Sequence, residues 1–394
     1  MTLTLEDLHG RVGDVDSHEH IPVARYPEIF GERAERFVES IEGLTDMMKM
    51  AGADDPMNLM ADRMEAEEIT PTNVWELKGS FAPSSMNMDR RPAVLEMMGI
   101  TRSLIFPGLG LVALAMAHGG NYVGFPSASE EGMKLAEDAI DAYNEWAGSF
   151  TQKYPEQLRI VGVLPSGRPG ITVEELVKKA EKLVATGVKA VQISSGLPPA
   201  GLSPADPAMD AFYKVLTDAD CALVFHPPSG AGFRASDVWG HVPGYFFDVT
   251  AVATVLHAAE ETFVNVLVLG GVFERHPDLR VGCIESGASW LGPLAERMDW
   301  LMATKQLGET PLTMRPSEYL ARHVRVSGLG AFDEPIDKYV ERFPALEDCY
   351  CYSSDFPHVE GMPYSMEIFY KKVAPMGDAF IEKFFCTNSQ LVLR

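Results

Sequence analysis

Basic residues are scarce in this chain of 394 residues, which carries 33 Lys and Arg against 56 Asp and Glu. The formal net charge of −23 argues against nucleic acid as the main partner, because phosphate binding needs a basic face. It also argues against an anionic membrane surface. The chain has no apolar run long enough to span a bilayer, and its N-terminus shows no signal-peptide pattern. We therefore expect no membrane association and no nucleic-acid function.

Cysteine is also rare. The five cysteines lie in the C-terminal half, and their spacing matches no disulfide framework. Reduced thiols of this kind are typical of a cytoplasmic protein. Cys349 and Cys351 lie in an apolar run, so we interpret both as small core residues rather than metal ligands. With 46% hydrophobic residues, the chain can bury a large core without covalent links.

Short apolar runs alternate with longer helical patterns along the chain. Eight runs are expected to be strands, at residues 11–16, 101–106, 158–164, 189–193, 222–226, 279–285, 323–327 and 348–354. Several are continuously apolar, as parallel strands covered on both faces are. Helices are expected between them, for example at 131–153 and at 172–186, where Thr172 and Glu175 form a capping-box pattern. Eight strand–helix alternations predict a single (β/α)8 barrel, a TIM barrel, over residues 1–394. A doubly wound sheet is less favoured because no GxGxxG motif opens the first unit.

Two stretches interrupt the alternation. Residues 23–98 separate the first two strands and are too long for a simple crossover. They contain a group of methionines, namely Met47, Met48, Met50, Met57, Met60 and Met64. We interpret 23–98 as a helical insertion with a Met-rich core, or alternatively as a cap over the barrel mouth that touches an apolar substrate or a partner subunit. The second stretch, 227–248, follows the fifth strand on the side where barrel active sites are built. Its Arg234 would bind a substrate carboxylate, or else is a solvated loop charge.

Two histidines close the first predicted strand. His18 and His20 are two residues apart, so on an extended strand their side chains point the same way. Two imidazoles at the carboxyl end of a barrel strand are suited to form half of a metal site. Glu19 would point away from that site, and Asp16 would support the histidines from behind.

Three more polar residues end other predicted strands: His226 ends the fifth, Glu285 the sixth and Asp355 the eighth. A carboxylate that leaves an apolar strand is costly to bury without a cation or donors. The first and eighth strands are neighbours in a closed barrel, which brings Asp355 next to the two histidines. Nitrogen and oxygen ligands without thiolate fit Zn²⁺, Mn²⁺ or Fe²⁺. The residues thus predict a divalent metal site.

Three other histidines are candidates of a different kind. His358 follows Asp355 by three residues and would orient a substrate. His257 lies in a helical apolar pattern, and His276 lies near a helix end where a cation suits the helix dipole. We interpret these last two as packing residues.

Taken together, these motifs resemble the amidohydrolase superfamily, in the amidohydrolase-related branch typified by aminocarboxymuconate-semialdehyde decarboxylase. The matching segments follow the family's order over nearly the whole chain, at 16–22, 226–227, 271–280, 285–290, 354–358 and the late Asn388. The resemblance implies a distorted (β/α)8 barrel with a helical insertion after the first strand. It also implies a metal held by His18, His20, His226 and Asp355, with the metal activating a water and the aspartate handling protons.

One position departs from that branch, whose decarboxylases present a histidine at the end of the sixth strand. This chain has Glu285 there, which cannot donate as an imidazolium does but can bind metal or act as a base. We therefore predict a metal-dependent enzyme that acts on a small organic acid, ester or amide through a metal-activated water, by hydrolysis, hydration or decarboxylation. Asp355 or Glu285 would move the proton. Zinc is the expected metal, with iron or manganese as alternatives.

Two other functions remain open. A few similar proteins hold two iron or manganese ions for oxygen-dependent chemistry, and Glu285 would supply the extra carboxylate of such a centre, with His358 or His257 as the extra imidazole. The other alternative is a silent barrel that supports a related partner subunit, although the intact ligand set speaks against it. The insertion and the acidic surface fit a homo-oligomer or a complex with a related subunit.

Overall fold

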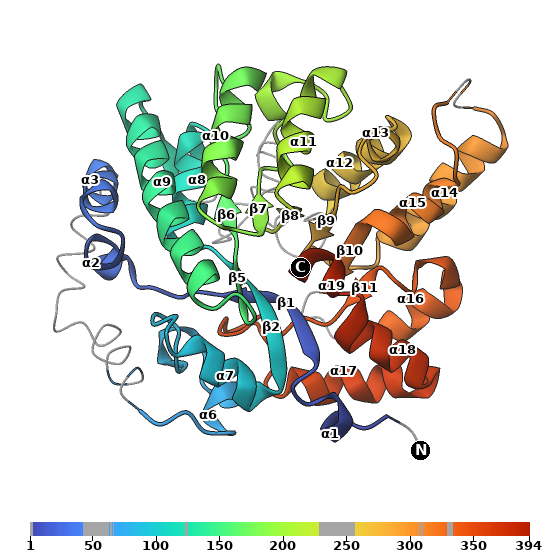
Figure 1. The fold of residues 1–394 in the computed structure, drawn as a ribbon, viewed down its shortest axis with the longest axis horizontal. Helices are drawn as coiled ribbons and strands as arrows, with labels where there is room; N and C mark the ends of the chain where they lie inside the picture. Colours follow the sequence, from blue (N-terminus) through green and yellow to red (C-terminus); the bar gives the residue numbers. More distant parts are fainter. Residues whose placement is uncertain are drawn as a thin grey trace, which may run out of the picture.

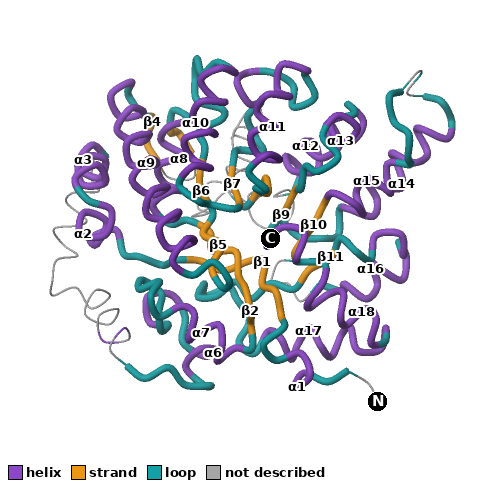
Figure 2. Tube along the Cα trace, viewed as in Figure 1, coloured by secondary structure: helices purple, strands orange, loops and turns teal. Residues whose placement is uncertain are grey.

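A computed structural model describes residues 3–41, 63, 65, 67–122, 125–227, 257–306, 308, 310–328 and 334–394. Helices surround a ring of short strands (Figures 1 and 2). Every predicted strand has a counterpart: β1 (Val12–His18), β2 (Ile100–Phe106), β5 (Leu158–Ile160) with β6 (Gly162–Val163), β7 (Ala190–Gln192), β8 (Ala222–Phe225), β9 (Val281–Cys283), β10 (Val324–Ser327) and β11 (Tyr350–Cys351). One antiparallel hairpin, β3 (Gly120–Tyr122) and β4 (Phe125–Ser127), was not expected from the sequence.

The strands pair in parallel, in the orders β1-β2-β5 and β11-β10-β9-β8-β7-β6. β5 and β6 are two halves of one predicted strand, interrupted at Val161, whose N–H donates to the carbonyl of Ile105 (2.9 Å). At the other seam, β1 meets the segment that follows β11. There the N–H of Asp355 donates to the carbonyl of Asp16 (2.8 Å), and the N–H of His18 donates to the carbonyl of Phe356 (2.6 Å). These bonds join the two sheets into the distorted (β/α)8 barrel that the sequence predicts.

Most of the helices follow strands and cover the outside of the ring (Figure 1). They are α8 (Leu109–Ala117), α9 (Glu130–Lys153), α10 (Val173–Ala185), α11 (Asp210–Asp218), α12 (Ala258–Leu269), α13 (Val272–Arg275), α14 (Leu291–Ala303), α15 (Pro316–His323), α16 (Ile336–Arg342), α17 (Ser365–Val373) and α18 (Asp378–Glu382). A further helix, α19 (Gln390–Leu393), lies across one end of the ring. The predicted start of α10 is confirmed, because the Thr172 hydroxyl accepts from the Glu175 N–H (3.2 Å). The Glu175 carboxylate does not return to the cap but pairs with Arg168. None of the described helices is long and apolar enough to cross a membrane.

The barrel interior is apolar, and α19 covers the end formed by the amino ends of the strands. The side chains that fill this interior are Val15, Leu104, Phe106, Val161, Ala190, Ala222, Val224, Ile284 and Cys351, together with Val392 and Leu393 of α19. The guanidinium groups of Arg102 and Arg159 donate to the carbonyl of Leu393 (3.1 Å each). His226, Glu285 and Asp355 follow the carboxyl ends of their strands and so lie toward the opposite end of the barrel. All five cysteines are free and buried, as the sequence predicts.

The described parts of residues 23–98 contain α2 (Tyr26–Phe30), α3 (Glu32–Ser40), α6 (Asn73–Glu76) and α7 (Arg91–Met98). The six methionines singled out from the sequence, between residues 47 and 64, lie outside the described residues. Part of this region supports the end of β1. The N–H of His20 donates to the carbonyl of Ser85, and the buried guanidinium of Arg91 donates to the carbonyl of His18 (2.8 Å each).

Candidate metal centre

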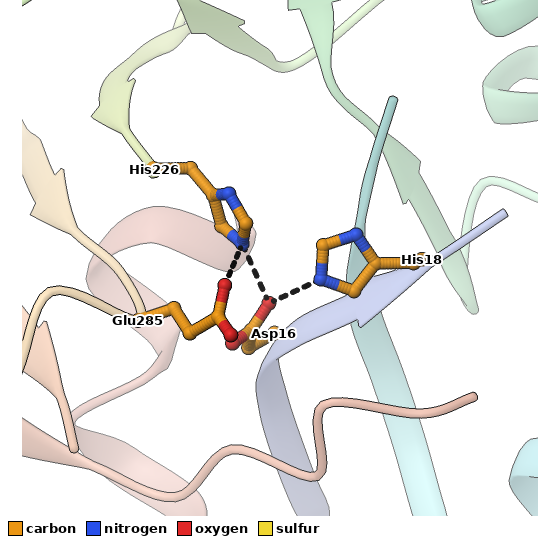
Figure 3. A group of neighbouring side chains, drawn as sticks. All are labelled: Asp16, His18, His226 and Glu285. Carbon is orange, nitrogen blue, oxygen red and sulfur yellow. Dashed lines mark ion pairs between the residues drawn. The ribbon is translucent and has the colours of Figure 1, made fainter. Parts of the chain in front are cut away.

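Four polar side chains converge where the strands end (Figure 3). Asp16 and His18 lie on β1, His226 follows β8, and Glu285 follows β9; each offers a ligand atom within 4.8 Å of the others. Asp16 lies between the two histidines, with Oδ1 at 3.3 Å from Nε2 of His18 and 3.4 Å from Nε2 of His226. Glu285 Oε2 lies 2.9 Å from the same nitrogen of His226. The Nδ1 of His226 faces the carbonyl of Pro227 at 2.7 Å. A carbonyl oxygen can only accept, so Nδ1 carries the hydrogen of the neutral ring. The other nitrogen, Nε2, is then the one that can bind a metal ion in the cluster.

A second group adjoins the first and shares His18 with it. The Asp355 Oδ1 atom lies 3.3 Å from Nε2 of His18 and 3.1 Å from Nδ1 of His358. The ring of His358 stacks on that of His18 with centroids 3.6 Å apart. Glu285, Asp355, His358 and Glu360 also form a group whose ligand atoms lie within 4.8 Å of one another. The predicted residues His18, His226, Glu285, Asp355 and His358 are therefore brought together.

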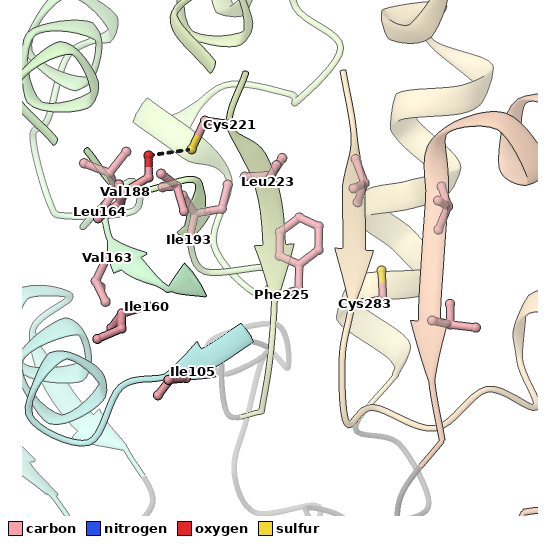
Figure 4. Packing of buried hydrophobic residues seen from close by; sticks show 14 of the residues in the cluster. Ile105, Ile160, Val163, Leu164, Val188, Ile193, Cys221, Leu223, Phe225 and Cys283 are labelled. Atoms are coloured by element: carbon pink, nitrogen blue, oxygen red, sulfur yellow. Dashed lines mark hydrogen bonds between the residues drawn. The ribbon is translucent and has the colours of Figure 1, made fainter. Parts of the chain in front are cut away.

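Apolar packing fixes the strands that deliver these ligands. Leu223 and Phe225 on β8 and Cys283 on β9 are fully buried (Figure 4). The chain turns sharply directly after such strands. Glu285 (φ 59°) and Asp355 (φ 51°) both have left-handed backbone, which is uncommon and strained for a residue with a side chain.

The centre contains buried polar atoms that no hydrogen bond satisfies. They are both carboxylate oxygens of Asp16, both of Asp355, Nε2 of His18 and Nδ1 of His358. The contacts of 3.1–3.3 Å among them are close enough for ion pairing but lack hydrogen-bond geometry. Burying an unpaired carboxylate is costly, so such a cluster needs a compensating cation. Imidazole and carboxylate together suit a divalent first-row metal, and the donor set fits one.

The charges of the site also call for a cation. Burial alone would lower the pKa of His18, but Asp16 and Asp355 raise it to about 9. Burial likewise opposes protonation of His226, yet Glu285 and Asp16 raise its pKa well above the usual value. For Asp355, burial would raise the pKa, but His18 and His358 hold it below its ordinary value. The carboxylates thus attract positive charge strongly, and a metal ion would replace the protons on the imidazoles.

His20, the second histidine of the predicted pair, lies outside these groups. β1 ends at His18, so the alternation of a strand does not extend to His20. Its ring is 5.9 Å from the ring of His358, and burial lowers its pKa to about 4, which leaves it neutral. The geometry therefore gives no support to His20 as a ligand of the converging group.

Asp16 is the residue whose position differs most from the expectation. The sequence suggested a supporting role, whereas its carboxylate offers a ligand atom to the converging group and neither of its oxygens has a hydrogen-bond partner. The signal that identifies it is the alternation itself. Asp16 precedes His18 by two residues on a continuous strand, so the two side chains share a face.

The other sequence candidates lie elsewhere. Glu19 accepts from the N–H groups of Ile21 (3.0 Å) and Gly108, so it faces away from the centre as expected. His257 Nε2 lies 3.6 Å from Glu261, and His276 Nε2 lies 3.0 Å from Asp210; neither histidine belongs to a candidate metal group. Arg234 and most of the loop 227–248 lie outside the described residues.

A lysine lies near the mouth of the centre. Lys78 is half-buried, and its ammonium forms no ion pair or hydrogen bond with a described residue. Burial lowers its pKa, while the nearby carboxylates of Asp355 and Glu360 act to raise it. The next residue, Gly79, donates its N–H to the carbonyl of Pro357 (2.6 Å), which fixes this segment against the Asp355 loop. Two exposed apolar side chains flank the same junction, Phe81 (41% exposed) and Val359 (78%).

Comparisons with known proteins agree with the fold. The family described as amidohydrolase matches residues 110–394. No curated protein matches the chain. Among solved structures, an amidohydrolase of Mycobacterium avium subsp. paratuberculosis is 18% identical with a TM-score of 0.67, over 98% of this chain and 99% of its own.

Two decarboxylases are similar as well. The 5-carboxyvanillate decarboxylase of Novosphingobium aromaticivorans, with bound manganese and 3-methoxy-4-hydroxy-5-nitrobenzoic acid, is 16% identical with a TM-score of 0.57, over 97% of this chain and 95% of its own. A 2,6-dihydroxybenzoate decarboxylase complexed with 2,6-dihydroxybenzoate is 15% identical with a TM-score of 0.58, over 97% and 99% of the two chains. At these identities the likeness shows a shared fold.

Proposed function

The chain belongs to the amidohydrolase family, and from that premise we propose that it is a metal-dependent hydrolase or lyase that acts on a small organic acid. The observation that supports this most is the convergence of buried, unsatisfied carboxylate and imidazole atoms at the carboxyl ends of the strands. Asp16, His18 and His226 would hold the ion, with Glu285 and Asp355 as further carboxylate ligands. Zinc, manganese and iron suit this donor set, and manganese is the ion bound by a decarboxylase of the same fold.

A divalent ion bound here supplies Lewis-acid polarisation of a substrate oxygen and lowers the pKa of water. The protein's own residues do the remaining work. Burial raises the pKa of Glu285, although the nearby His226 acts to lower it. Glu285 is therefore placed to accept a proton and return it. Asp355 holds the imidazole of His358 over that of His18, and so fixes one wall of the site. Carboxylates in these positions serve hydrolysis, hydration or decarboxylation, and the two similar decarboxylases favour the last.

The substrate class follows from Lys78 and its surroundings. A half-buried ammonium without a partner among the described residues is suited to bind the carboxylate of a substrate. The exposed side chains of Phe81 and Val359 would contact an apolar body. Two proteins of the same fold are named for aromatic carboxylic acids, which agrees with this chemistry.

With benzoate and 2,6-dihydroxybenzoate as probes, Lys78→Met should weaken binding to the metal-loaded protein about tenfold, whereas Lys214→Met on the exposed face of α11 should not. Equal affinities in both variants would contradict the role of Lys78.

Metal analysis of anaerobically purified protein tests the proposal. We expect one divalent ion per chain in the wild type, and its loss when Asp16→Asn is combined with His18→Ala. His257→Gln is the matched control, because His257 lies outside the candidate groups and should leave the metal content unchanged. Full metal content in the double variant would refute the ligand assignment.

A second function is favoured by the second group of ligands. Glu285, Asp355, His358 and Glu360 could hold a further ion beside the first, as a dinuclear iron or manganese oxygenase requires. This alternative predicts two ions per chain and oxygen consumption in the presence of substrate. One ion per chain and no oxygen uptake would exclude it. Assembly into a homo-oligomer, or with a related subunit, stays a prediction.

A further inference from the structure

Each of the two carboxylate ligands with left-handed backbone has a serine beside it. Ser354 precedes Asp355, and Ser286 follows Glu285. Such backbone persists only where the surrounding contacts hold it. Both serine hydroxyls are buried, and each is bound by a buried acid from another part of the barrel.

The first acid, Asp14, joins the two sides of the barrel seam. Its carboxylate is fully buried and accepts both the N–H (2.9 Å) and the hydroxyl (2.7 Å) of Ser354. The hydroxyl oxygen of Ser354 in turn accepts from the N–H of Phe356 (3.1 Å). Asp355 is thus fixed through both of its neighbours. The same carboxylate accepts from the N–H of Asp16 (3.1 Å), so one group holds candidate ligands from two strands.

The second acid, Glu260, lies on α12 behind the site. It is 1% exposed, and its Oε1 accepts the hydroxyl of Ser286 at 2.6 Å. On the other side of the turn, the N–H of Glu285 donates to the hydroxyl of Ser327 (2.9 Å). Glu285 is therefore held from both sides, as Asp355 is. Neither Asp14 nor Glu260 belongs to a candidate metal group.

We propose that Asp14 and Glu260 are positioning residues of the metal centre, which hold Asp355 and Glu285 in their left-handed turns through the two serine hydroxyls. This inference rests on the proposed function, because it assumes a metal bound by these carboxylates. Each acid sets the direction of a ligand without touching the ion. Outer groups of this kind typically change metal affinity about 10- to 100-fold when they are removed.

The test is Co²⁺ binding to the metal-free full chain, followed by affinity and by the visible absorption spectrum, which reports ligand geometry. Ser286→Ala and Glu260→Leu should each weaken Co²⁺ binding about tenfold or more and shift the spectrum. Glu260→Gln keeps an oxygen that accepts the Ser286 hydroxyl, and should stay within about threefold of wild type. The double variant Ser286→Ala with Glu260→Leu should be no weaker than the worse single variant, because both act through one hydrogen bond.

The seam is tested in the same way with Ser354→Ala and Asp14→Asn. Both oxygens of Asp14 accept hydrogen bonds, so an amide group cannot replace the carboxylate here, and each variant should weaken Co²⁺ binding about tenfold and shift the spectrum. A control variant, Ser129→Ala, removes a serine that caps α9 by accepting from the N–H of Gly132 (3.0 Å), far along the chain from the ligands. It should reduce stability without changing Co²⁺ affinity or the spectrum. If the serine and acid variants lose stability but keep the Co²⁺ affinity and the absorption spectrum of the wild type, the inference is overturned and the metal centre stands. A wild type that binds no Co²⁺ would refute the proposed function itself, and the inference with it.

Discussion

Gly361 offers a way to displace the Asp355 loop without removing any ligand. A Cβ atom on this residue would lie 2.8 Å from the carbonyl oxygen of Asp355, 3.0 Å from that of Ser354 and 3.2 Å from that of His358. All three are backbone atoms, so none can rotate away. Gly361 is not among the residues with positive φ, and alanine can adopt its backbone. The effect of Gly361→Ala is therefore steric.

The size of the displacement follows from these distances. Ordinary contacts of a Cβ atom begin near 3.4 Å, so the carbonyls of Asp355 and Ser354 must retreat by about 0.6 and 0.4 Å. Binding and catalytic groups need to be placed within about 0.5 Å. We expect Gly361→Ala to weaken metal binding about 10- to 100-fold. Overpacking of this kind should also lower the free energy of unfolding by about 1–3 kcal/mol.

The assay is competition for Zn²⁺ between the protein and a chromophoric chelator, with thermal unfolding measured in parallel. Gly132→Ala in α9 is the matched control, since its Cβ would meet a side-chain atom, Oγ of Ser129 at 3.3 Å, and no atom of the site. It should leave the Zn²⁺ affinity unchanged. If Gly361→Ala folds and binds Zn²⁺ as tightly as the wild type, the loop is not held as the structure indicates, and the reasoning fails.

Three further predictions follow from burial and charge. Leu393→Ala should lower the free energy of unfolding in urea by about 2–5 kcal/mol, because Leu393 is fully buried in the barrel interior; a loss well under 1 kcal/mol would contradict that placement. Burial lowers the pKa values of His118 and His323 to about 4, so the unfolded chain binds protons that the folded chain does not, and stability should fall as the pH drops from about 6.5 to about 4. His118→Gln should flatten that pH dependence in urea titrations, and an unchanged slope would show that His118 titrates normally in the folded protein. Zn²⁺ at about 100 times its Kd should stabilise the protein by about 2.7 kcal/mol, and a chelator should reverse the shift in Tm; a Tm that does not respond to either would contradict the metal centre.

The barrel could be predicted from the sequence because its strands are short, apolar and buried on both faces. Each predicted run overlaps an observed strand, and the family match bears out the resemblance to the amidohydrolase superfamily. The break of the third strand at Val161 was not visible, because it depends on a change of partner: β5 pairs with β2, whereas β6 pairs with β7. The hairpin at 120–127 was missed for a similar reason, since it is held by pairing rather than by an alternating pattern.

The sequence predicted most of the residues that converge in the candidate site, but not which residues of the first strand join them. The positions of His226, Glu285 and Asp355 follow from strand ends, which the sequence marks well. The choice between Asp16 and His20 depends on where β1 stops. Beyond His18 the chain leaves the sheet, and the N–H of His20 donates to the carbonyl of Ser85 in the insertion (2.8 Å). No local pattern near residue 18 contains this information.

The seam between β1 and the segment after β11 has a consequence for the protein in the cell. Candidate ligands lie on both sides of that seam. A bound ion would therefore link the first and last parts of the barrel at the point where it closes. Binding would therefore stabilise the closed barrel, and metal-loaded chains should resist proteolysis for longer than metal-free ones.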